Sequence, residues 1–192
     1  MKKPILALLI CLLLASLIAC DDASDTPDTT AAHETTAPVD DVTASPAEDF
    51  IFEENEDGSY TLIKYIGKER DVIVPSMIDG KNVSAIGENA FSESDIIKPN
   101  TLLSVTLPST VKTIGDYAFE RCKTLTAVVL PEGIVSIGHF AFSECTQLSN
   151  ITLPSTLLEL GTGTFYYCNS LNSINIPDSL TKIPSGDRKS VV

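Results

Sequence analysis

The feature that most constrains the fold of this 192-residue chain is a pattern of residues that recurs every 23 positions. Four segments begin with leucine, and each carries a proline six residues later. The columns are Leu102, Leu125, Leu148 and Leu171; Val105, Val128, Ile151 and Ile174; Leu107, Leu130, Leu153 and Ile176; Pro108, Pro131, Pro154 and Pro177; and Ile114, Ile137, Leu160 and Ile183. A repeat of about 20 to 50 residues indicates a solenoid, in which each coil packs only on its neighbours.

Each repeat predicts one short strand followed by a turn. The apolar residues of L-x-x-V-x-L alternate as they do in a strand, and the following proline ends it because proline has a fixed φ and no N–H. Gly115 and its equivalents then permit a tight bend. We therefore expect a β-rich solenoid of 23-residue coils with one parallel strand ladder and short turns.

Two further columns, one of phenylalanine and one of cysteine, are predicted to lie in the core. They comprise Phe119, Phe142 and Phe165, with Phe91 in an earlier and less regular copy, and Cys122, Cys145 and Cys168. Equivalent Cα atoms of adjacent coils lie about 5 Å apart, but their Cβ vectors run parallel, which disfavours disulfides. A buried ladder of free cysteines is the favoured interpretation. One disulfide or a metal site remain alternatives, although zinc sites prefer paired C-x-x-C spacing.

The L-P, I-G and A-F-x-x-C elements at this spacing resemble the BspA-like leucine-rich repeats of bacterial surface proteins. The resemblance covers about residues 50–183 and includes the early copy around Val72–Pro75 and Phe91. It implies a leucine-rich repeat fold, and adhesion is the role usually inferred for the family.

The segments on either side of the repeats divide the chain further. Residues 50–70 hold two β-rich runs around Asp57-Gly58, which predicts a hairpin that caps the solenoid of residues 71–183. In residues 184–192, Pro184 and Arg188 stand where the repeat has glycine and phenylalanine. We expect this irregular tail to be truncated or non-native.

Residues 1–19 have the pattern of a secretory signal, with Lys2 and Lys3 before an apolar run that is too short to span a bilayer comfortably. The Leu17–Cys20 ending resembles the lipobox of bacterial lipoproteins. That resemblance implies a lipid attached to Cys20 and a protein anchored in the bacterial cell envelope, facing outward. An ordinary cleaved signal is the alternative.

Residues 20–49 predict a disordered tether rich in acidic residues, Thr, Pro and Ala. Residues 21–49 contain nine acidic residues and no Lys or Arg, so they cannot bury enough apolar surface to fold. The formal net charge of -13 comes largely from here, since residues 102–192 have seven acidic and six basic residues. Nucleic acid is therefore not an expected partner.

Two candidate contact surfaces remain outside the core. The residues between the buried strand positions share one face by alternation, and we call this the strand face: Ser104, Thr106, Ala127, Val129, Asn150, Thr152, Ser173 and Asn175. The second surface, the aromatic patch, comprises Tyr117, Phe140, Tyr166 and Tyr167. Tyr is enriched at binding hot spots. A merely soluble strand face, and rings that only cover the coil below, are the alternatives.

No catalytic residue, metal site or cofactor site is predicted. His33 and His139 lack a nucleophile or ligand partner in the sequence and are interpreted as surface residues. We therefore expect a lipid-anchored, non-catalytic surface protein that binds an extracellular protein or glycan. The alternative is an anchoring or scaffold fragment of a longer surface protein whose effector or enzymatic part is missing.

Overall fold

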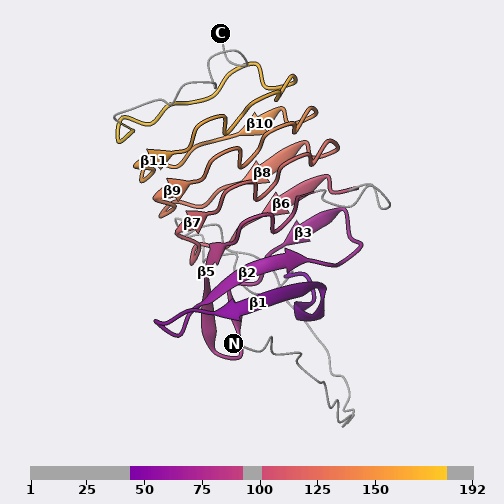
Figure 1. The fold of residues 1–192 in the computed structure, drawn as a ribbon, viewed down its shortest axis with the longest axis vertical. Helices are drawn as coiled ribbons and strands as arrows, with labels where there is room; N and C mark the ends of the chain where they lie inside the picture. Colours follow the sequence, from indigo (N-terminus) through magenta and orange to yellow (C-terminus); the bar gives the residue numbers. More distant parts are fainter. Residues whose placement is uncertain (1–43, 93–100, 181–192) are drawn as a thin grey trace, which may run out of the picture.

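The computed structural model describes residues 44–92 and 101–180, which stack as coils along one long axis (Figure 1). The predicted signal, Cys20, His33, most of the tether and the tail of residues 184–192 lie outside the described residues. A 3-10 turn spans Ala47–Asp49, and the strands are β1 (Phe50–Glu54), β2 (Tyr60–Tyr65), β3 (Asp71–Ile73), β4 (Met77–Ile78), β5 (Lys81–Ile86), β6 (Ser104–Thr106), β7 (Thr113–Ile114), β8 (Ala127–Val129), β9 (Ser136–Ile137), β10 (Asn150–Ile151) and β11 (Glu159–Leu160).

The predicted parallel strand ladder is confirmed, but the coils that begin at Leu102, Leu125 and Leu148 each contribute two short strands, so the expectation of one strand per coil was wrong. The first ladder has the order β10-β8-β6-β3, and the second has the order β1-β2-β5-β7-β9-β11, with β4 beside β5. The second ladder arises because the column of Ile114, Ile137 and Leu160 points into the core from extended backbone. The extended segments of successive coils then pair in parallel, with Ile114 opposite Ile137.

The register of the first ladder confirms the 23-residue coil. Val105 lies opposite Val128, and Val128 lies opposite Ile151, in parallel pairing throughout. Each apolar column of the sequence therefore becomes a row of side chains that runs along the solenoid.

The β1–β2 hairpin forms as predicted at the N-terminal end of the stack. β2 is antiparallel to β1 but parallel to β5, so it joins the hairpin to the second ladder. Leu62 of β2 is fully buried, and the Tyr65 ring lies 5.6 Å from that of Phe91 in the first coil. The hairpin thus covers core that the first coil would otherwise expose.

The described structure includes residues 44–49, which the sequence analysis placed in the tether. The backbone N–H of Ser45 donates to the carbonyl of Ile73, and the Ser45 hydroxyl accepts from the Ile73 N–H. These bonds satisfy polar groups along β3 at the end of its ladder, which explains why this short polar stretch is held in place.

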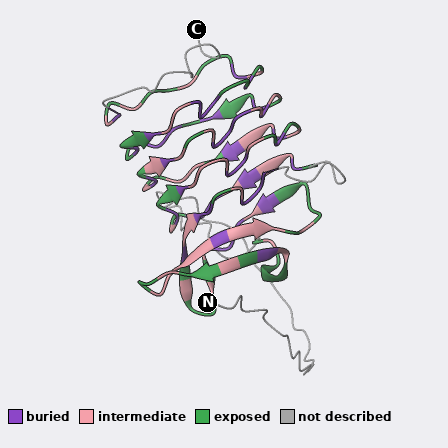
Figure 2. Cartoon of the chain, viewed as in Figure 1, coloured by how far each residue is buried: buried purple, intermediate pink, exposed green. Residues whose placement is uncertain are grey.

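The phenylalanine column forms one continuous stack through the core. Ring centroids lie 4.8 Å apart for Phe91 and Phe119, 5.0 Å for Phe119 and Phe142, and 5.7 Å for Phe142 and Phe165, with interplanar angles of 6 to 7°. All four rings are buried. Figure 2 shows that buried residues recur in each coil, so the core is continuous along the solenoid.

The repeat glycines are required for close packing of the coils and not for a bend that needs a positive φ. Gly87, Gly115, Gly138 and Gly161 are not among the residues with positive φ. A Cβ on Gly115 would lie 2.8 Å from the backbone nitrogen of Glu88, closer than real Cβ contacts come. The tight-bend interpretation was therefore wrong for this column.

The last described coil, residues 171–180, contains no assigned strand. The Asn175 side chain takes the place of a ladder there, since its Oδ1 accepts from the Leu153 N–H at 2.9 Å and its Nδ2 donates to the Leu153 carbonyl at 2.8 Å. Ile176 is 43% exposed, although the equivalent Leu107 and Leu153 are buried. The repeat pattern of the sequence thus continues into residues 171–180, where the strand ladders have ended.

Candidate functional site

The strand face is continuous across the first ladder. Pairing aligns Ser104 with Ala127 and Asn150, and Thr106 with Val129. Val129 is 56% exposed at its centre. The Asp71 carboxylate, which accepts a hydrogen bond from Ser104, lies at the edge of this face.

The last part of the predicted strand face is not on a strand. Ser173 and Asn175 are exposed but lie in the coil without strands, and Thr152 follows the end of β10. Because Asn175 is hydrogen-bonded to Leu153, its amide is engaged in packing the coil. The face therefore presents three regular rows, fewer than the sequence indicated.

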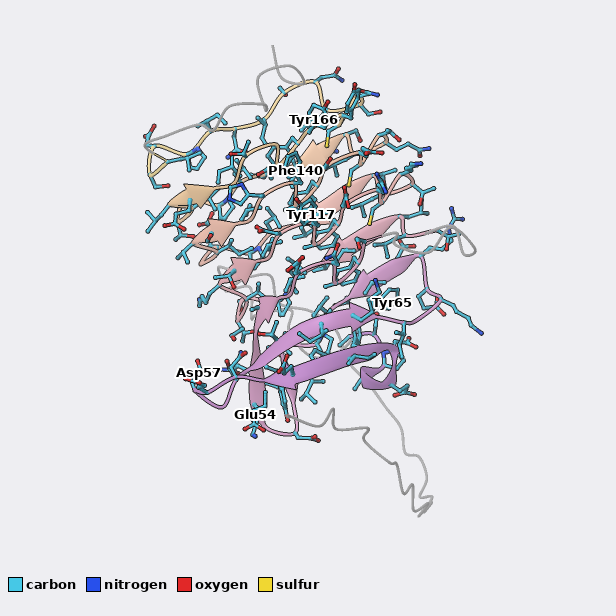
Figure 3. All side chains as sticks on the ribbon, in the orientation of Figure 1. Glu54, Asp57, Tyr65, Tyr117, Phe140 and Tyr166 are labelled. Atoms are coloured by element: carbon cyan, nitrogen blue, oxygen red, sulfur yellow. The ribbon has the colours of Figure 1, made fainter. Side chains whose placement is uncertain are left out.

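The structure brings the four residues of the aromatic patch together. Tyr117 stacks on Phe140 at 5.6 Å and 8°, Phe140 meets Tyr166 edge to face at 6.5 Å, and Tyr166 meets Tyr167 edge to face at 4.4 Å. Figure 3 shows Tyr117, Phe140 and Tyr166 following one another along the long axis. Tyr166 is 38% and Tyr167 is 53% exposed. The patch is a row of rings that becomes more exposed toward its C-terminal end.

Three of these rings are attached to backbone in the left-handed region. The φ angles are 57° for Tyr117, 54° for Phe140 and 57° for Tyr167. A side chain with a Cβ rarely adopts this region, which glycine and asparagine favour. Gly163 occupies the same repeat position as Tyr117 and Phe140, with a φ of 68°. The turn thus has a fixed backbone conformation that accepts either an aromatic residue or glycine.

Gly163 shapes the patch because it has no side chain. A Cβ on this residue would lie 2.7 Å from Cδ1 of Phe140 and still closer to Cε1. The Phe140 ring therefore occupies the space that a third ring of the column would need. Tyr166, from a different repeat position, supplies the next ring instead.

Charged groups border the exposed end of the patch. Arg121 forms an ion pair with Glu144, with Nε and Oε1 3.5 Å apart. The hydrogen bond between the Tyr166 and Tyr167 hydroxyl groups raises the pKa of Tyr166 above its ordinary value. Electrostatic interactions with Tyr167 and Glu144 act in the same direction. Tyr166 therefore remains a neutral phenol near neutral pH.

The cysteine column is a ladder of buried free thiols, which excludes the disulfide alternative in this structure. Each Sγ donates to a phenylalanine carbonyl of the preceding coil: Cys122 to Phe91 at 3.2 Å, Cys145 to Phe119 at 3.1 Å, and Cys168 to Phe142 at 3.1 Å. Burial raises the pKa of the Cys145 thiol, and the neighbouring Cys122 contributes to the shift. These cysteines are therefore part of the packing between coils.

The sequence interpretation missed a polar column in which side chains bind backbone amides of the next coil. Asp116 Oδ1 accepts from the N–H of His139 at 2.7 Å, and His139 Nδ1 accepts from the N–H of Thr162 at 2.9 Å. We call these residues the capping column. Its signal was available in the sequence, because the three residues are spaced by 23 and follow the repeat glycine.

Within residues 44–92 and 101–180, no group of three or more His, Cys, Asp or Glu side chains is arranged to hold a metal ion. The same segments contain no helix with the length and apolar character needed to cross a membrane. The signal region and Cys20 lie outside these segments.

The coils, the two parallel ladders and the buried aromatic column define a leucine-rich repeat solenoid. The family model described as BspA type Leucine rich repeat region matches residues 84–186 with 6 copies. The chain therefore belongs to the BspA-type leucine-rich repeat family, as its repeat elements predicted. Solenoids of this class are generally binding scaffolds without chemistry of their own.

Solved structures of bacterial leucine-rich repeat proteins share this fold. The Treponema pallidum leucine-rich repeat protein is 34% identical, with a TM-score of 0.71 over 75% of this chain and 65% of that one. A leucine-rich cell surface protein of Faecalibacterium prausnitzii is 28% identical, with a TM-score of 0.56 over 74% and 45%. A Bacteroides capillosus leucine-rich repeat protein is also 28% identical, with a TM-score of 0.56 over 68% and 95%.

The chain spans 65% and 45% of the lengths of the first two of these proteins. No curated protein matches it.

Proposed function

We propose that this protein is a non-catalytic binding protein of the bacterial cell surface, and that its aromatic patch contacts an extracellular protein. The family supports a binding role, because solenoids present extended surfaces built from repeated positions. A leucine-rich cell surface protein among the relatives supports display outside the cell. Adhesion is the role that combines the two.

The observation that carries this proposal is the left-handed backbone under the exposed rings. For residues other than glycine this conformation costs about 1–2 kcal/mol, yet Tyr117, Phe140 and Tyr167 adopt it. Gly163 shows that the turn of Tyr117 and Phe140 forms without a ring, and Arg121 and Glu144 adopt the same conformation at the repeat position of Tyr167. The conformation therefore belongs to the repeat, and the support for a contact surface is that this fixed backbone presents partly exposed aromatic rings.

The arrangement of the rings favours a protein partner over a glycan. A sugar stacks on the open face of an aromatic ring, whereas Tyr117 and Phe140 turn faces toward each other at an interplanar angle of 8°. Tyr166 and Tyr167 are perpendicular to each other and lie beside the Arg121–Glu144 ion pair. Tyr with Arg in a mixed polar surrounding is typical of protein interfaces.

Replacing Tyr167 with asparagine is expected to reduce binding without destabilising the fold. Asparagine tolerates the left-handed region, so the free energy of unfolding should stay within about 0.5 kcal/mol of the wild type or rise slightly. Loss of a tyrosine hot spot should weaken binding by about tenfold or more. Immobilised wild-type and variant proteins would be compared on a panel of purified extracellular proteins and on a glycan array.

Thr152→Arg is the matched control, because it places a long charged side chain on the strand face and leaves the patch intact. A protein ligand that survives Thr152→Arg and is lost in Tyr167→Asn supports the proposal. Binding that is lost in Thr152→Arg and kept in Tyr167→Asn would instead place the binding site on the strand face. Binding to glycans alone would contradict a protein partner.

We also propose that a lipid on Cys20 anchors the protein and that the acidic segment from residue 20 to residue 43 holds the solenoid away from the membrane. The lipobox-like Leu17–Cys20 sequence supports this. Cys20→Ser is expected to shift most of the protein from the membrane fraction to the soluble fraction. Unchanged fractionation of the variant, with no acyl mass on the N-terminal peptide of the wild type, would rule out the anchor.

A second candidate, a module of a longer surface protein, is favoured by the greater length of two relatives. Isolation of the native protein at a mass well above the 20.6 kDa of this chain would support it. Such a protein could still bind a partner through the aromatic patch. The two candidates differ in whether binding is the whole function or whether another part of a longer protein supplies a further activity.

A further inference from the structure

The capping column links one titratable side chain to the turn beneath the aromatic patch. The backbone N–H of His139 donates to Asp116 Oδ1, while His139 Nδ1 accepts from the N–H of Thr162 in the next coil. Nδ1 therefore carries no proton in this arrangement, since both partners of a hydrogen bond cannot be donors. The Thr162 amide depends on the neutral form of the imidazole.

Asp116 and His139 occupy the same repeat position but differ in what protonation does to them. A carboxyl group keeps an acceptor oxygen even when it is protonated, whereas a protonated imidazole has two N–H donors and no acceptor. Protonation of His139 would place an N–H opposite the N–H of Thr162. Acid can therefore break the hydrogen bond that the capping column makes between the coil beginning at Leu125 and the coil beginning at Leu148.

The groups around His139 favour movement of a charged ring away from Thr162. The preceding coil presents the Asp116 carboxylate and the Tyr117 phenol, and the segment of residues 161–164 in the following coil has no titratable side chain. A protonated His139 ring is attracted to the Asp116 carboxylate of the preceding coil. Residues 161–164 of the following coil have no negatively charged side chain that could attract it. It would therefore turn toward Asp116.

The turn that would be released is the one that positions the rings. The Thr162 carbonyl accepts from the Phe140 N–H at 3.1 Å, and the Gly163 carbonyl accepts from the Tyr166 N–H at 3.0 Å. The Phe140 ring also lies against Gly163. A change at Thr162 therefore reaches both Phe140 and Tyr166 through direct contacts.

We propose that His139 is a pH-sensitive latch, and that its protonation frees the Thr162 amide and weakens binding at the aromatic patch. The release of this amide follows from its hydrogen bond to His139 alone. The bonds from the Gly161 N–H to the Ile137 carbonyl and from the Phe142 N–H to the Thr164 carbonyl still hold the rest of the turn. The effect on binding rests on the proposed function of the patch.

Amide hydrogen exchange of the full chain at about pH 7.5 and about pH 5.5, corrected for intrinsic exchange, tests the latch without any partner. Loss of one hydrogen bond should raise the exchange of Thr162 by up to about tenfold at the lower pH. His139→Asp restores the acceptor found at Asp116, so protection should not change between the two pH values. His139→Ala should show raised exchange at both.

Asp116→His provides the reciprocal test, because it should transfer pH-dependent exchange to the amide of residue 139. Equal protection of Thr162 at both pH values in the wild type, or full protection in His139→Ala, would overturn the latch. If exchange behaves as expected but a patch ligand binds equally at both pH values, the latch stands and its link to binding fails. Loss of binding in Tyr167→Asn separately tests the site itself.

Discussion

Replacing Phe142 with alanine is expected to lower the free energy of unfolding by about 3–5 kcal/mol, the usual cost of truncating a buried phenylalanine. The Phe142 ring is fully buried and stacks between Phe119 and Phe165, so its removal leaves a cavity that interrupts the aromatic column. This loss is a large share of the roughly 5–15 kcal/mol that stabilises a typical domain. Denaturant unfolding followed by circular dichroism would measure it.

Phe140→Ala is the matched control, because it removes the same side chain two residues away on the partly exposed side of the coil. We expect this change to cost less than half as much, and Phe142→Leu to recover part of the loss by refilling the cavity. Equal destabilisation by Phe142→Ala and Phe140→Ala would show that the buried column does not dominate the stability of the coil.

Gly161→Ala is expected to cost about 3 kcal/mol, the upper end of the usual range for overpacking, through a different cause, a clash between coils. A Cβ on Gly161 would overlap the carbonyl carbon of Gly138 and the backbone nitrogen of His139, and backbone cannot move aside as a side chain can. The coils would have to separate, which would weaken the 2.8 Å bond from the Gly161 N–H to the Ile137 carbonyl. A marked fall in the melting temperature should follow.

Gly58→Ala separates this steric effect from backbone strain. Gly58 has a φ of 81°, and a Cβ added there would meet no atom within 4 Å, so only the left-handed conformation is penalised. We expect a loss of about 1 kcal/mol there. Comparable losses at Gly58 and Gly161 would argue against close packing as the reason for the repeat glycine.

The core of the regular coils was predictable from the sequence because its residues contact their equivalents 23 positions away. Phe142 meets Phe119 and Phe165, and Val128 pairs with Val105 and Ile151, so recurrence of residue type is enough to place them. The second ladder was missed because its strands in the regular coils, β7, β9 and β11, are two residues long. Strands that short show no alternation.

The site was less predictable because it depends on backbone conformation and not on residue type alone. The sequence brought Tyr117 and Phe140 together by position, but it gave no indication of their left-handed φ angles or of the space at Gly163. His139 was interpreted as an unpartnered surface residue because its partner is a main-chain N–H and not a side chain, and only the 23-residue spacing of Asp116, His139 and Thr162 indicated the capping column. Asn175 was misplaced for the same reason.

The left-handed turn also has a consequence for how recognition by this scaffold can be altered. Tyr117, Phe140 and Gly163 share nearly the same φ although their side chains range from a phenol to a hydrogen atom. The main chain of the turn is therefore set by the coils. The residues at Tyr117 and Phe140 could be exchanged to alter ligand specificity, whereas a side chain at Gly163 would fit only if the Phe140 ring were replaced as well.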